Sequence, residues 1–182
     1  MMKEEMVILV NENDEPLGAM EKMQAHRRGV LHRAFSVFIF NNKGEMLLQQ
    51  RAFSKYHSGG LWTNACCSHP FPEEDVQLAA QRRLQEEMGF YTPVKKIFDF
   101  LYRAEFDNGL TEHEFDHVFA GKYEDVINFN PEEVNDYCFK ELGEIRQSIQ
   151  THSQKYTAWF KIAFPKVEEW WISHFNKTLP EL

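Results

Sequence analysis

The sequence predicts an α/β sandwich, in which helices cover a mixed sheet. Three observations support this fold class: short β-rich segments alternate with turns, an amphipathic helix lies in mid-chain, and the C-terminal part is aromatic and helical. The chain has 182 residues, so we expect one domain over residues 1–182. An apolar content of 43% with 16 phenylalanines predicts a packed core.

Short strands are expected in the first third of the chain. The predicted strands are residues 6–10, 34–40 and 45–51. The last two flank the polar turn Asn41 to Gly44, so we expect them to form a hairpin. The charged stretch 18–28 is expected to be irregular or weakly helical.

The mid-chain helix is predicted by its ends and by its apolar stripe. Proline followed by acidic residues, from Pro72 to Asp75, is typical of the first turn of a helix, and Gly89 is typical of its end. Between these ends, apolar residues recur every four positions and predict a buried face: Val76, Ala80, Leu84 and Met88.

The second half of the chain adds further strands and helices. Strands over 97–106 and 114–123 are expected around an Asp-Asn-Gly turn at 107–109. A strand over 134–139 and a helix over 140–149 follow. The last segment, 152–176, is expected to be an amphipathic helix that ends or kinks at Pro165.

Charge and composition exclude several classes of partner. The net charge of -8 argues against a nucleic acid or an anionic membrane surface as partner. No apolar run approaches the roughly 20 residues of a membrane span. The charged start and the odd number of cysteines, 3, suit a reducing compartment. We therefore expect a cytoplasmic protein that is a monomer or a weak homodimer.

The mid-chain helix carries an acidic pattern with a known chemistry. Residues 82–90 resemble the end of a Nudix box, with Glu74 at the upstream acidic position and Ser68 at the glycine position. Such carboxylates bind hard divalent cations, which in turn bind diphosphate oxygens, although a glutamate pair alone can be an ordinary solvated face. Arg83 stands where Nudix hydrolases have a glutamate that helps to activate water. A guanidinium there suits the binding of phosphate oxygens instead.

A second group of possible metal ligands lies outside this helix. Glu112 and Glu114 are two residues apart, so on a strand they face the same side. Together with His26, His32 and His69 they would form a mixed nitrogen and oxygen site for Zn²⁺, Mn²⁺ or Mg²⁺. Each histidine alone is more often an ordinary hydrogen-bonded residue, so the site requires that all five converge.

As an ordered set, these features resemble type I isopentenyl diphosphate isomerase, a non-hydrolysing branch of the Nudix superfamily. The resemblance covers residues 21–159. It is carried by Glu21-Lys22, His26, Leu31 to Ser36, Gln50-Arg51-Ala52, Ser54-Lys55, Trp62-Thr63-Asn64, Cys67 to Pro70, Arg82-Arg83, Glu87 to Gly89, Tyr102-Arg103-Ala104 and Glu112-His113-Glu114. It implies a Nudix-type α/β/α sandwich with a mixed sheet and a C-terminal helical segment. It also implies interconversion of isopentenyl and dimethylallyl diphosphate in isoprenoid biosynthesis.

The resemblance also implies a role for each candidate residue. Cys67 and Glu114 would be the acid/base pair, with Tyr102 orienting the carboxylate or relaying a proton to it. The diphosphate would be held by four cations: Lys22, Arg51, Lys55 and Arg83. Mg²⁺ bridged by Glu87 would complete the neutralisation, and the His/Glu site would hold a further Mn²⁺, Zn²⁺ or Mg²⁺ ion.

Two residues keep a structural alternative. Trp159 would face a carbocation by cation–π contact, or it packs in the core. Cys66 is expected to be a small buried residue, because on a strand it points away from the side that Cys67 faces.

Two other functions compete with the isomerase. One is a Nudix hydrolase of a nucleoside diphosphate derivative, against which Arg83 argues. The other is a regulatory module that binds metal or diphosphate without turnover.

Overall fold

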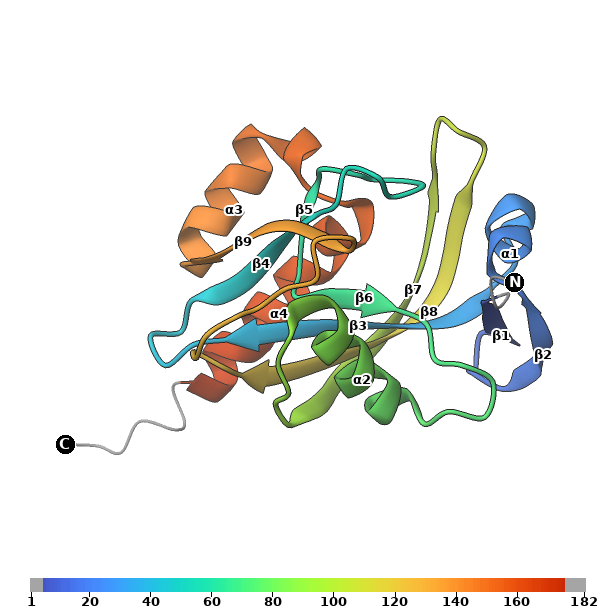
Figure 1. Cartoon of the computed structure of the whole chain (residues 1–182), viewed down its shortest axis with the longest axis horizontal. Coiled ribbons are helices and arrows are strands. Elements are labelled where there is room, and N and C mark those ends of the chain that lie inside the picture. The colour runs from blue at the N-terminus through green and yellow to red at the C-terminus, as the bar shows by residue number, and fades with distance from the viewer. Residues whose placement is uncertain (1–4, 176–182) are drawn as a thin grey trace.

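A computed structural model describes residues 5–175 (Figure 1). The strands are β1 (Met6–Val10), β2 (Pro16–Glu21), β3 (His32–Phe40), β4 (Met46–Arg51), β5 (Trp62–Thr63), β6 (Cys66–Ser68), β7 (Val94–Glu105), β8 (Thr111–Lys122) and β9 (Val134–Lys140). The helices are α1 (Lys22–Arg28), α2 (Val76–Met88), α3 (Leu142–Thr151), the 3₁₀ turn η1 (Ser153–Lys155) and α4 (Ala158–Phe175).

Within the described residues, 9 strands form one mixed sheet. Strand β3 lies at its centre, because it pairs parallel with β8 and antiparallel with β6. The parallel register begins at His32 opposite Glu114 and ends at Phe40 opposite Lys122. Strands β7 and β8 form a long antiparallel hairpin beside it.

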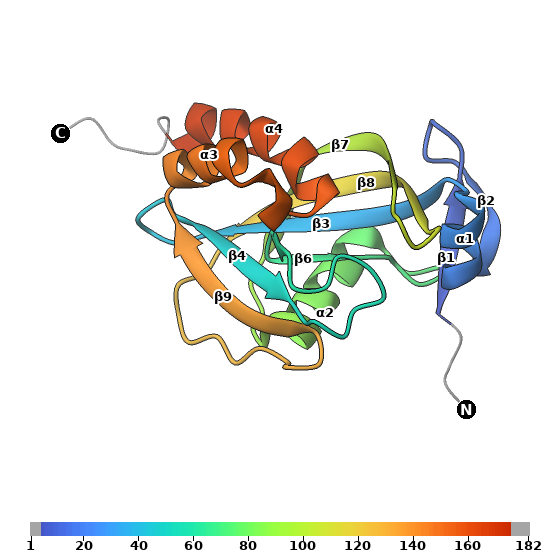
Figure 2. The ribbon, with the colours of Figure 1, turned by 90° about the horizontal axis from the view of Figure 1, so that it is seen from above.

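Helices cover both faces of this sheet, as Figure 2 shows with α3 and α4 on one side and α2 on the other. Side chains alternate along a strand, so β3 contributes to two cores. Phe38 and Phe40 pack in the core with α4, whereas Val37 and Ile39 pack in the core with α2. The predicted α/β/α sandwich with a C-terminal helix is therefore confirmed.

Helix α2 ends where the sequence predicts. Gly89 has a φ of 76°, which glycine adopts without strain. A Cβ at this position would lie 2.0 Å from the carbonyl oxygen of Asn128, so no other residue fits. The predicted start of the helix was wrong, because Asp75 is the N-cap and the helix begins at Val76. Glu73 has a φ of 66°, so the proline and acidic residues form a turn before the helix.

Three other expectations need correction. Residues 18–28 are not irregular: they divide into the end of β2 and helix α1, which Glu21 caps by accepting from two backbone N–H groups. Strands β3 and β4 form the predicted antiparallel hairpin, but they meet only at Phe40 and Met46, because β4 continues along β9 and β5. Helix α4 does not end at Pro165, which lies inside it, and a kink at this residue stays a prediction. Asn176, the last residue of the predicted segment, lies outside the described residues.

Among residues 5–175, no helix is long and apolar enough to cross a bilayer.

Candidate active site

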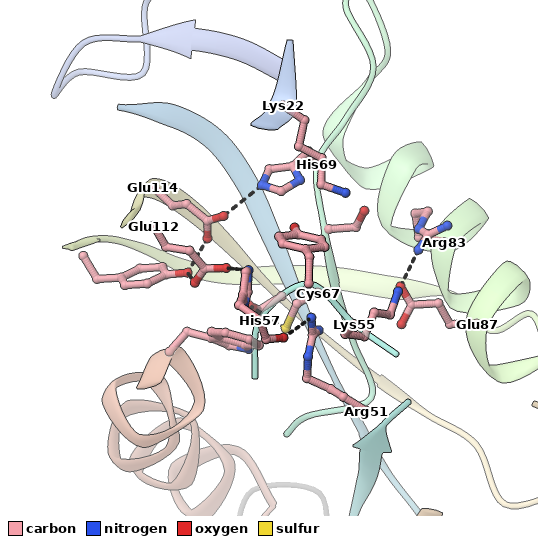
Figure 3. Close-up of a pocket in the computed structure, with 15 residues that line it drawn as sticks. Lys22, Arg51, Lys55, His57, Cys67, His69, Arg83, Glu87, Glu112 and Glu114 are labelled. Atoms are coloured by element: carbon pink, nitrogen blue, oxygen red, sulfur yellow. Dashed lines mark hydrogen bonds and ion pairs between the residues drawn. The ribbon is translucent and has the colours of Figure 1, made fainter. Parts of the chain in front are cut away.

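One pocket collects most of the residues that the sequence predicts for the site (Figure 3). It lies between β8, the β4–β5 connection, helix α2 and the start of α4. The predicted residues that line it are Lys22, Arg51, Lys55, Cys67, His69, Arg83, Glu87, Tyr102, Glu112, Glu114 and Trp159. His26 and His32 are fully buried beside this pocket and join the cluster described next.

Imidazoles and a carboxylate converge at one end of the pocket. The register of β3 and β8 sets His32 opposite Glu114, and the Nε2 atom of His32 lies 3.5 Å from Oε1 of Glu114. His69, which follows β6, has its Nε2 atom 2.8 Å from the same oxygen. With His26 from α1, the four ligand atoms all lie within 4.8 Å of one another. These four predicted ligands therefore lie together, whereas Glu112 belongs to a second group with His26 and His57.

The imidazoles present the nitrogen that a metal ion needs. Nδ1 of His26 lies 2.7 Å from the carbonyl oxygen of Lys22, and Nδ1 of His32 lies 2.8 Å from that of Val30. A carbonyl only accepts, so each Nδ1 carries a proton and each neutral ring keeps a lone pair on Nε2. Among residues 5–175, neither Nε2 atom has a hydrogen-bond partner. Such second-nitrogen bonds are typical of histidines that bind metal.

The protonation states also suit a cation. Burial lowers the pKa of His69 to about 4, so this imidazole is neutral near pH 7. Burial acts to raise the pKa of Glu114, but the adjacent imidazoles of His32 and His69 hold that pKa well below its usual value. An anionic carboxylate and a neutral imidazole are the forms that bind metal.

Tyr102 ties the two glutamates together. Its hydroxyl lies 2.7 Å from Oε2 of Glu112 and 2.5 Å from Oε2 of Glu114. Burial and the two carboxylate charges raise the pKa of Tyr102 well above its usual value. The tyrosine therefore keeps its proton, and it leaves Oε1 of each glutamate to other partners.

The Cys67 thiol is held in a partly buried hydrogen-bonded network. Its Sγ atom lies 3.0 Å from Oδ1 of Asn64 and 3.5 Å from Oγ of Ser36, which in turn donates to Asp116 at 2.7 Å. Nδ2 of Asn64 donates to the carbonyl oxygens of Val37 and Cys66, so its Oδ1 atom faces the thiol. Burial raises the pKa of Cys67, and the Asp116 charge raises it further. The thiol is therefore a proton donor at neutral pH.

The adjacent cysteine differs from Cys67 as the sequence predicts. Cys66 is fully buried in the core with α2, whereas Cys67 faces the opposite side of the sheet and the pocket. The alternation of side chains along β6 produces this difference.

The predicted diphosphate cations stand at the other end of the pocket. Lys22 pairs with Glu5 at 2.6 Å, and Lys55 pairs with Glu133. Arg83 donates to Glu87 at 2.6 Å and to Glu86 at 2.8 Å. Glu87 also accepts from Gln49 at 2.9 Å, so both of its carboxylate oxygens have a partner.

Arg51 and Trp159 form a separate contact. The guanidinium carbon of Arg51 lies 5.2 Å from the centroid of the Trp159 ring. The ring is 3% exposed, packs in the core with α4 and also lines the pocket. The expected core packing of Trp159 is thus observed, and the ring also lines the pocket.

Sequence reasoning assigned no role to several residues of the site, of which Ser36, Asn64 and Ser68 were named only as motif residues and the others not at all: Ser36, Tyr56, His57, Ser68, Asn64, Asp116 and Glu133. Asp116 has a readable signal, because it continues the two-residue period of Glu112 and Glu114 along β8. His57 lies in an irregular connection, where no period applies.

Comparison with known proteins first defines a class. A family model described as the NUDIX domain matches residues 30–160. Among solved structures, the crystal structure of DR0079 from Deinococcus radiodurans superposes with a TM-score of 0.69. It is 18% identical and covers 81% of this chain and 90% of its own, a likeness that shows the fold alone.

Curated relatives define the branch within this class. A protein of Pectobacterium atrosepticum named isopentenyl-diphosphate Delta-isomerase is 50% identical over 165 residues, 91% of this chain and 92% of the relative. One of Photorhabdus laumondii, named isopentenyl-diphosphate Delta-isomerase 2, is 46% identical over 172 residues, 92% of this chain and 97% of the relative. The chain therefore belongs to the isopentenyl-diphosphate Delta-isomerase family, which confirms the predicted isomerase over the hydrolase.

Proposed function

We propose that this chain interconverts isopentenyl diphosphate and dimethylallyl diphosphate by a 1,3-proton shift in isoprenoid biosynthesis. Protonation of the terminal alkene carbon gives a tertiary carbocation, and loss of a proton from the carbon on the other side of the cation gives the isomer. The observation that carries the proposal is that a thiol and a carboxylate, Cys67 and Glu114, line one pocket beside a cluster of cations. One group gives a proton as the other takes one, so the shift is balanced.

The acid/base pair is Cys67 and Glu114, with Tyr102 as the positioning residue. The raised pKa of Cys67 supports a thiol that holds a proton, and the lowered pKa of Glu114 supports a carboxylate that can accept one. Tyr102 is within hydrogen-bond distance of Glu114 and fixes the carboxylate. Buried walls would also keep water from trapping the cation.

A divalent ion at the His/Glu cluster fits the donor set. His26, His32, His69, Glu112 and Glu114 would hold it, and the orphaned Nε2 atoms support this assignment. When bound, Mn²⁺, Zn²⁺ or Mg²⁺ would supply positive charge that tunes the Glu114 carboxylate.

The diphosphate is proposed to bind at the cationic end of the pocket. Lys22, Arg51, Lys55 and Arg83 line it, and an acidic chain needs such local charge to hold an anion. Binding would exchange protein carboxylates for phosphate oxygens at three of these cations. Glu87 would meet a Mg²⁺ ion carried by the diphosphate.

Trp159 is proposed to stabilise the carbocation. Its ring lines the same pocket as Cys67, and a cation on the face of a desolvated indole gains about 2 kcal/mol. The proposed partner is thus a small-molecule diphosphate. We propose neither a nucleic acid nor a membrane as a partner. We also propose a cytoplasmic enzyme that is a monomer or a weak homodimer.

The direct test is incubation with isopentenyl diphosphate and Mg²⁺, followed by NMR. We expect dimethylallyl diphosphate and an equilibrium mixture of the two isomers. Nucleotide diphosphate derivatives serve as the comparison, with an assay for phosphate release. Robust release without isomer formation would overturn the proposal, and binding without either product would indicate the regulatory module.

A further inference from the structure

His57 is a buried imidazole that the proposed mechanism does not use. It lies in the connection between β4 and β5, and its side chain is 2% exposed. Its Nε2 atom lies 3.0 Å from Oε1 of Glu112, the contact drawn in Figure 3. That contact lacks hydrogen-bond geometry, so among residues 5–175 the nitrogen has no hydrogen-bond partner. A desolvated nitrogen without a partner is costly unless something binds it.

Aromatic rings fix the direction of this imidazole. Phe106 stacks on it with centroids 4.7 Å apart and planes at 9°. Tyr56 meets it edge-on at 4.5 Å, and Trp159 does so at 5.9 Å. The ring is thus held with Nε2 toward Glu112 and with Nδ1 3.3 Å from the hydroxyl of Ser58.

One tyrosine orients both carboxylates of the cluster. Tyr102 occupies Oε2 of both Glu112 and Glu114. Oε1 of Glu114 faces His32 and His69, and Oε1 of Glu112 faces His57. One hydroxyl therefore leaves one oxygen of each carboxylate facing an imidazole.

The potential ligands form two overlapping groups. One group is His26, His32, His69 and Glu114, and the other is His26, His57 and Glu112. They share His26, whose Nδ1 atom is bonded to a backbone carbonyl, so only its Nε2 atom is available. One nitrogen lone pair binds one ion, so His26 cannot serve a separate ion in each group.

We propose that His57 is a ligand of this ion, so that four imidazoles and two carboxylates surround it. The inference rests on the metal site of the proposed function and adds a donor to it. Six donors complete an octahedral sphere, and four nitrogens among them favour Zn²⁺, Mn²⁺ or another transition metal over Mg²⁺, which prefers oxygen. Glu112 and His57 also link the ion to the wall formed by Trp159.

The first test counts imidazole ligands in the Zn²⁺-loaded protein by X-ray absorption, and needs no variant. Four imidazoles are expected. A count of three overturns the proposal, even where removal of His57 weakens binding, because His57 then acts only by positioning Glu112.

The second test measures metal affinity of the metal-free protein against a chromophoric chelator. His57→Phe keeps an aromatic ring in the clamp and removes the donor. We expect Zn²⁺ to bind about 10–100-fold more weakly, with a smaller change for Mg²⁺. His152→Ala, at an exposed histidine outside the pocket, should bind as the parent does. Equal Zn²⁺ affinity in parent and His57→Phe would contradict the proposal.

Neither readout depends on turnover, so the two proposals fail separately. A parent protein that binds Zn²⁺ through four imidazoles but forms no dimethylallyl diphosphate would sink the proposed function and keep this inference. An active isomerase with three imidazoles would do the reverse.

Discussion

The two ends of the pocket are built on different physical principles. At the thiol and carboxylate end, side chains from β3, β6, β7 and β8 are buried and held by hydrogen bonds between fixed strands. At the cationic end, Lys22, Lys55 and Arg83 are partly exposed and pair with carboxylates. Proton transfer needs one geometry, whereas charge neutralisation tolerates several. The comparison therefore predicts that single substitutions reduce enzymatic activity far more at the buried end than at the cationic end.

The largest effect is expected for Cys67→Ala. Removal of the acid/base thiol should lower kcat by about 10²–10⁴-fold, the usual range for a general acid or base. The fold should remain, as measured by circular dichroism, because Cys67 is partly exposed and the change is small. Cys66→Ala is the matched control and should keep most activity, since that thiol faces the α2 core. The opposite pair of phenotypes would show that the thiols are assigned wrongly.

A smaller effect is expected for Lys55→Met at the cationic end. Loss of one charge-assisted contact to the diphosphate should raise KM about tenfold, or about 1.5 kcal/mol, and change kcat less. Steady-state kinetics separates the two constants. A fall in kcat as large as that of Cys67→Ala would break the distinction between the two ends.

A pH-dependent gain in stability is expected for Asp116→Asn in the metal-free protein. Burial and the charge of Glu114 raise the pKa of Asp116 well above its usual 3.8. A raised carboxyl pKa means that ionisation opposes folding, so the parent loses stability as pH rises above about 3.8. Asparagine has no such charge, and its advantage in urea unfolding should therefore be larger at pH 7 than at pH 3.5. An equal gain in unfolding free energy at pH 7 and at pH 3.5 would contradict the raised pKa of Asp116.

The smallest effect is expected for Glu5→Gln. Glu5 is mostly exposed and pairs with Lys22, and exposed ion pairs contribute about 0–1 kcal/mol. Release of Lys22 should lower KM for the diphosphate by less than about fivefold. Unfolding should not change measurably. A large rise in KM would mean that Glu5 helps to bind the substrate and does not compete with it.

Much of this site was readable from sequence because the chemistry follows strand and helix periods. Glu112 and Glu114 share a face of β8, and the two cysteines separate for the same reason. The carboxylates of α2 and the stop at Gly89 follow from a helix pattern. The features that could not be predicted from sequence depend on contacts between residues far apart in the chain. The short contact of β3 with β4 depends on the competing strand β9, and His57 is oriented by rings from three other segments.

The vicinal cysteines have a consequence for how this chain can change. Strand β6 has 3 residues, and the Asn64 amide spans it by binding the carbonyl oxygens of Cys66 and of Val37 on β3. A one-residue slip of so short a strand would exchange the faces of the two cysteines. The pocket would then still contain a thiol. The hydrogen bonds of Asn64 thus help to fix the register of β6, and this register determines which of the two cysteine thiols faces the pocket.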